Sequence, residues 1–149
     1  MKVIDIVTSF MAALEANNFA SAAAAMDNNF FFGGWLPETL EKDQFLDLMR
    51  GLKAGIPDLM FNTRNLVAIE NTNAVQGTMQ VTGKHTATIN LSVLRIPPIQ
   101  PTGRSVSLPT EPVVYVVENN LITRMNVTPT PNGGIKGLLQ QLGINSSAL

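Results

Sequence analysis

The chain has 149 residues, a formal net charge of −1 and no cysteine, and its ten lysines and arginines are scattered along it. The lack of cysteine excludes disulfides and sulfur-ligated metal sites, and a single histidine excludes a histidine-rich metal cluster. Scattered basic residues form no stripe that would neutralise phosphates, so we expect no nucleic-acid partner.

Charged residues make up only 14% of the chain, against about a quarter in an ordinary soluble domain. Such a shortage indicates a covered surface, most simply a homodimer interface. No stretch approaches the apolar length of a membrane span, and Asp5 interrupts the only apolar run near the start. We therefore expect a cytoplasmic protein without membrane contact, folded as one domain over residues 1–149.

The first half of the chain predicts two amphipathic helices. A stripe at helical spacing begins at Val3 and ends at Leu14, and a second runs through residues 40–54. Between them we expect a short alanine-rich helix at 19–26 and a short strand at 29–32. The apolar residues of the two stripes are Val3, Val7, Phe10, Met11 and Leu14, then Phe45, Leu48, Met49 and Leu52.

The second half predicts an antiparallel meander. Residues 74–91 alternate strictly between apolar and polar side chains, which indicates one long strand, and the only histidine, His85, lies on the apolar face. Further strands are expected at 59–70, 105–118 and 121–128. A closing helix at 135–142 completes a fold of the α+β class.

The last two strands are predicted to form a hairpin through Asn119 and Asn120, which tolerate positive φ. If Glu118 opposes Leu121, a regular ladder places Tyr115 opposite Arg124 on the outer face. The same register gives the inner face the side chains of Val114, Val116, Leu121, Thr123, Met125 and Val127.

Five segments, in this order and with similar spacing, resemble the SnoaL-like polyketide cyclases of the nuclear transport factor 2-like, cystatin-like superfamily. They are FLDLMRGL at 45–52, IPD at 56–58, GKHT at 83–86, PTGR at 101–104 and GLLQQLG at 137–143. The resemblance implies a cone, in which a strongly curved antiparallel sheet wraps around the N-terminal helices, with a short C-terminal helix. It also implies an enclosed pocket and frequent dimerisation through the outer face of the sheet.

The family closes a ring by an intramolecular aldol reaction, without metal or cofactor. Its catalytic His and Asp, separated by one residue, lie on the last strand shortly after the hairpin. The corresponding positions here are Met125 and Val127. Neither side chain can transfer a proton, and losing a general acid or base forfeits roughly a hundredfold to ten-thousandfold in rate.

His85 is then the single catalytic candidate, although an imidazole satisfied within the core is equally compatible with its position. The predicted ligand is a small apolar or polyketide-like molecule. The protein either only binds it or also converts it by a proton transfer that needs no cofactor. A non-catalytic binding module and a dimeric interaction domain with a filled core are the alternatives. The predicted ligand-lining residues are Phe32, Trp35, Met79, His85, Val114, Val116, Thr123, Met125 and Val127.

Overall fold

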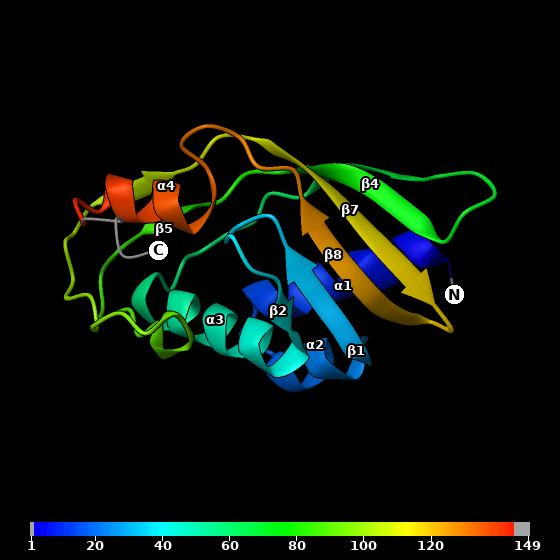
Figure 1. The fold of residues 1–149 in the computed structure, drawn as a ribbon, viewed down its shortest axis with the longest axis horizontal. Coiled ribbons are helices and arrows are strands. Elements are labelled where there is room, and N and C mark those ends of the chain that lie inside the picture. The colour runs from blue at the N-terminus through cyan, green and yellow to red at the C-terminus, as the bar shows by residue number, and fades with distance from the viewer. Residues whose placement is uncertain (1, 145–149) are drawn as a thin grey trace.

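The computed structural model describes residues 2–144 (Figure 1). No helix in this part of the chain is long and apolar enough to cross a membrane. The α-helices of the described residues are α1 (Val3–Glu15), α2 (Phe19–Ala24), α3 (Lys42–Gly55) and α4 (Gly134–Gln141), and a single 3₁₀ turn, η1, covers Ser92–Leu94.

The main sheet has the strand order β2-β1-β8-β7-β4-β3. Its neighbouring strands are antiparallel except for β1 and β8, which run parallel. A separate small sheet pairs β5 with β6. The strands are β1 (Met26–Gly33), β2 (Leu40–Glu41), β3 (Arg64–Ala68), β4 (Ala74–Met79), β5 (Thr82–Lys84), β6 (Ser105–Ser107), β7 (Glu111–Glu118) and β8 (Leu121–Val127).

The curled sheet covers the N-terminal helices, and the predicted α+β class is confirmed. Figure 1 shows α1, α2 and α3 together on one side of the main sheet, with α4 beside β5 at the end of the molecule away from the N-terminus. Helix α4 is tied there by Gln141, whose amide accepts from Ser107 N and donates to Ser107 O. The buried face of α1 follows the predicted stripe, with Ile6 in place of the partly exposed Val3: Ile6, Val7, Phe10, Met11 and Leu14.

Helix α3 begins two residues later than predicted. Leu40 and Glu41 extend as β2 and pair with Phe32 and Phe31 of β1. Glu41 is also the N-cap of α3 and forms a reciprocal capping box with Gln44, which satisfies two amides of the first turn. The helix start is therefore fixed by its cap rather than by the first apolar residue.

The long strand predicted at 74–91 is divided, although its alternating burial is real. Val75, Met79, Val81, His85 and Ile89 are all buried. The ladder with β7 stops at Met79, because the chain then changes partner: Gln80 N donates to Phe61 O, and Thr82 bonds Met60. The prediction of one strand at 105–118 is wrong for the same reason, since its first part, β6, pairs with β5 instead.

The predicted register of the β7–β8 hairpin holds only at its first two pairs. Glu118 opposes Leu121, and Val117 opposes Ile122, but Val116 opposes Arg124. Thr123 is the extra residue of a β-bulge, which shifts every later pair by one position. The inner face of β7 therefore carries Val113, Tyr115 and Val117, while Val114 and Val116 turn outward, opposite to the prediction.

Candidate functional site

The two positions that the resemblance assigns to acid–base chemistry lie inside the cone. Met125 is 1% exposed and Val127 is fully buried, both on the inward face of β8. Their side chains are apolar, so neither can accept or donate a catalytic proton. These two residues follow the bulge and point inward as predicted, whereas before the bulge Ile122 points inward in place of the predicted Leu121 and Thr123.

Aromatic side chains fill the interior next to β8. The rings of Phe32 and Phe45 are 4.9 Å apart between centroids, and Trp35 meets Phe32 edge-on at 5.4 Å. Trp35 is buried, and its indole N–H has no hydrogen-bond partner among residues 2–144. Phe32, Trp35 and Met79 are core residues of the described structure, and their contact with a ligand stays a prediction.

His85 is fully buried and is held by the turn before β6. Its Nδ1 accepts from the backbone N–H of Thr102 at 3.2 Å and lies 2.9 Å from the Thr102 hydroxyl. Because the amide can only donate, the neutral ring carries its proton on Nε2, which is buried without a partner among residues 2–144. The ring's Nδ1 is therefore already engaged by Thr102, and no carboxylate in this part of the chain bonds the imidazole.

The buried charged side chains of the described residues, Lys53 and Glu111, are engaged by backbone or hydroxyl groups. Lys53 donates to the carbonyls of Pro57 and Leu59 at 3.0 and 3.3 Å, and Glu111 accepts from the amide and hydroxyl of Thr130, both at 3.0 Å. Within residues 2–144, no three or more His, Cys, Asp or Glu side chains gather where they could hold a metal ion. The described residues thus bring together no acid–base pair around His85.

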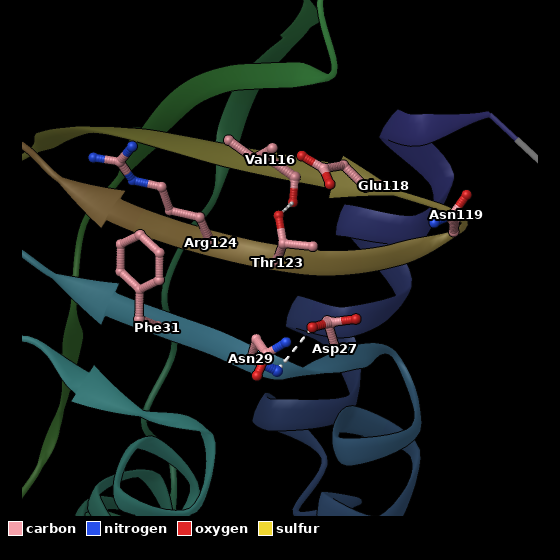
Figure 2. Close-up of a pocket in the computed structure, with 8 residues that line it drawn as sticks. All are labelled: Asp27, Asn29, Phe31, Val116, Glu118, Asn119, Thr123 and Arg124. Atoms are coloured by element: carbon pink, nitrogen blue, oxygen red, sulfur yellow. Dashed lines mark hydrogen bonds between the residues drawn. The ribbon is translucent and has the colours of Figure 1, made fainter.

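Two of the predicted lining residues instead border a hollow on the outer face of the sheet. Figure 2 shows Val116 and Thr123 there, beside Arg124, whose guanidinium lies 5.2 Å from the ring centroid of Phe31. This hollow measures about 480 Å³ and is open to solvent. The β-bulge is the physical reason that these two residues, together with Val114, do not line the cone.

A second hollow, the α1–β3 groove, runs between helix α1 and the segment that leads into β3. It measures about 370 Å³. Glu15 fixes one wall, because its carboxylate accepts from Phe61 N at 2.8 Å. The groove is lined by Thr8, Met11, Ala12, Glu15, Met60, Asn62, Thr63, Arg64 and Leu66.

Thr63, which lines this groove, has a buried hydroxyl that neighbours the buried hydroxyl of Tyr115. Among residues 2–144, neither oxygen makes a hydrogen bond of good geometry. Burial raises the pKa of the Tyr115 phenol above its ordinary value, and the neighbouring Thr63 hydroxyl offsets this rise only in part. A buried hydroxyl without a partner costs about 1 to 3 kcal/mol, so each of them invites an additional hydrogen-bonding group.

The sequence did not point to these two residues. The regular register predicts an outward Tyr115, and Thr63 falls within a segment predicted as strand but observed as irregular chain before β3. Asn62, directly before Thr63, and Asn65, two residues after it, both have positive φ. Asparagine tolerates that conformation, and the two asparagines are the one local signal that could have indicated an interrupted strand.

Comparison with known proteins identifies the family. The model of the SnoaL-like domain matches residues 7–125, so the chain belongs to the SnoaL-like family. No protein of curated function matches the sequence.

Solved structures share the fold at low identity. The candidate polyketide cyclase IdmH of Streptomyces antibioticus is 14% identical, with a TM-score of 0.70 over 97% of this chain and 100% of that chain. A candidate SnoaL-like polyketide cyclase of Jannaschia sp. CCS1 is 12% identical, with a TM-score of 0.72 over 96% and 92%. An epoxide hydrolase of Mycobacterium tuberculosis is 17% identical, with a TM-score of 0.66 over 95% and 92%. These likenesses confirm the predicted cone fold.

Proposed function

We propose that this protein binds a small, largely apolar molecule in the SnoaL-like cone without catalysing a proton transfer. The observation that supports the proposal is the buried, apolar inward face of β8, where Met125 and Val127 occupy the positions that the resemblance assigns to the family's acid–base pair. An apolar interior of this kind favours an apolar ligand, because binding removes the ligand's apolar surface from water.

The position of His85 supports binding rather than catalysis. A general base must reach the proton that it removes, and the base is normally oriented by a third group. The His85 ring is fully buried, and its bonded neighbour is the Thr102 turn rather than a carboxylate. The imidazole is better suited to holding that turn than to moving a proton.

Native mass spectrometry tests the binding proposal. Protein purified without organic solvent or detergent is compared with the same sample after denaturation, and we expect a small molecule in the native spectrum that denaturation releases. Incubation of the molecule with fresh protein should return it unchanged by mass and by NMR. Conversion to an isomer or cyclised product would overturn the non-catalytic part, and a ligand-free native spectrum would count against binding altogether.

We also propose a homodimer formed through the outer face of the sheet. The half-buried Val114 and Val116 point outward, and charged residues are only 14% of the chain. Light scattering after size-exclusion chromatography should give twice the chain mass, and Val116→Lys should reduce it to one chain. A wild-type monomer would contradict this arrangement.

A further inference from the structure

We propose that residues 95–101, the proline segment, are a docking site for a partner protein whose aromatic groove and acidic pocket bind extended proline-rich chain, as SH3 domains do. The segment has the sequence RIPPIQP, in which Arg95, Pro98 and Pro101 stand three residues apart. This spacing contains the P-x-x-P pattern of polyproline II ligands. The inference is independent of the proposed small-molecule binding, because it concerns a partner protein on the surface.

The prolines restrict the backbone of the segment. A proline ring holds φ at about −65°, and it also confines the residue before it to extended backbone. The three prolines therefore restrict every residue from 96 to 101 except Ile99. Ile99 is extended as well, because it forms an antiparallel bridge with Ile89, with both N–O distances at 2.9 Å. These constraints favour the polyproline II helix, which has three residues per turn.

The burial of the segment follows this period of three. Ile96 packs against the core, Ile99 is only 6% exposed, and Thr102 bonds the ring of His85 through its amide and its hydroxyl. One line of the helix is therefore anchored on the body of the protein, and the other two lines face solvent. The exposed residues are Pro97, Pro98, Gln100 and Pro101.

The anchored backbone suits docking without further ordering. Figure 1 shows the loop that holds the proline segment at the end of the molecule that carries β5 and α4. Because its extended conformation is already fixed, binding costs little conformational entropy. A ridge of exposed proline rings fits a groove lined by aromatic side chains.

The charge beside the prolines selects the kind of groove. Arg95 is exposed, and its φ of 58° ends the 3₁₀ turn η1 at the point where the proline segment begins. Arg104, at the other end, donates to Gln141 O and is held on the protein. The sequence has no Asp or Glu from residue 71 to residue 110. An acidic pocket next to the aromatic groove would therefore meet an uncompensated positive charge at Arg95.

Titration with an SH3 domain tests the inference. Full-length, ¹⁵N-labelled protein is mixed with increasing amounts of a purified, unlabelled SH3 domain that selects R-x-x-P-x-x-P ligands, and backbone amide shifts are the readout. We expect saturable shifts that are largest in residues 95–103. An excess of a synthetic R-x-x-P-x-x-P peptide that binds the same domain should reverse them.

Variants of exposed residues isolate the contact. The double variant Pro98→Ala, Pro101→Ala should weaken binding at least about tenfold, and Arg95→Ala should weaken it by about tenfold, whereas Arg95→Lys should retain most of the affinity. Pro131→Ala and Arg64→Ala are the matched controls, because each removes an exposed residue of the same type elsewhere on the protein. Neither control should change the affinity.

An intact protein that does not bind the SH3 domain, or shifts confined to residues outside 95–103, would overturn the inference. An affinity that survives the double proline variant would overturn it too, and the prolines would then only shape the loop. Unchanged binding by Arg95→Ala would reject the acidic pocket and with it the proposed kind of partner. A loss of binding in the two controls equal to that in the proline and arginine variants would show that the contact is not specific to this segment.

Discussion

The backbone N–H of Thr102 donates to Nδ1 of His85 at 3.2 Å, and the Thr102 hydroxyl lies 2.9 Å from the same nitrogen. The backbone strengthens this connection, because His85 N donates to Arg104 O and Gly103 N donates to His85 O. The single histidine therefore joins the end of β5 to the turn before β6. Its position on the apolar face, which suggested catalysis, has a structural explanation.

His85→Ala should destabilise the protein by about 2 to 4 kcal/mol. The substitution removes a fully buried ring and leaves the Thr102 amide without its acceptor. Urea denaturation followed by circular dichroism measures the change. Thr102→Val, which removes only the hydroxyl, should cost about 1 kcal/mol. An unchanged midpoint for His85→Ala would show that the imidazole does not hold the turn.

Alkaline pH should destabilise the fold through Tyr115. Burial raises the pKa of this phenol above the ordinary value of 10.0, so above that pH the unfolded chain loses the proton while the folded chain keeps it. The free energy of unfolding then falls by about 1.4 kcal/mol for each further pH unit from this one group.

Tyrosinate absorbance near 295 nm measures this effect cleanly, because Tyr115 is the only tyrosine in the chain. We expect the absorbance to rise only together with unfolding. The stability of Tyr115→Phe over the same pH range gives the comparison that isolates this one group from every other effect of alkaline pH. Reversible ionisation of Tyr115 near pH 10 in folded protein would contradict its buried position.

The bulge at Thr123 predicts opposite tolerances for neighbouring valines. Val113→Thr should cost about 1 to 3 kcal/mol, because it buries a hydroxyl in the core. Val114→Thr should cost less than about 1 kcal/mol, because this side chain is half-buried on the outer face. Thermal denaturation of the two single variants compares them directly. A larger loss of stability for Val114→Thr than for Val113→Thr would mean that Val114 faces the core, as the regular register predicts.

Gly51→Ala should destabilise helix α3 although alanine is the better helix former. A Cβ at position 51 would lie 2.0 Å from the carbonyl oxygen of Asn90, which is backbone and cannot move aside easily. The resulting strain of about 1 to 3 kcal/mol outweighs a gain in helix propensity of about 1 kcal/mol.

Ala54→Gly on the exposed side of the same helix is the matched control for this comparison. We expect it to lose about 1 kcal/mol, the ordinary cost of glycine in a helix. Urea midpoints of the two variants measure both effects. A stabilised Gly51→Ala protein would mean that residues 86–94 do not pack against α3 at this point.

Much of the fold could be predicted because its determinants are local. The stripe from Val7 to Leu14 places one face of α1 in the core, and period-two alternation identifies the buried side chains from Val75 to Leu91 even where the strand is broken. Both patterns depend only on which side chains must leave water. The five motifs in register along the chain likewise indicated the SnoaL-like family, which the comparison with the family model confirms.

By itself, the sequence determined the α+β class, the helices and the apolar inward positions Met125 and Val127, because side-chain periodicity and residue identity settle these without reference to distant neighbours. Only the tertiary structure decided which face Tyr115 occupies and that Thr63 lies beside it. One extra residue at Thr123 reverses the face of every earlier position on β7. Whether a ladder accommodates such a bulge depends on how both strands pack against α1. That packing is formed by residues that are distant in sequence.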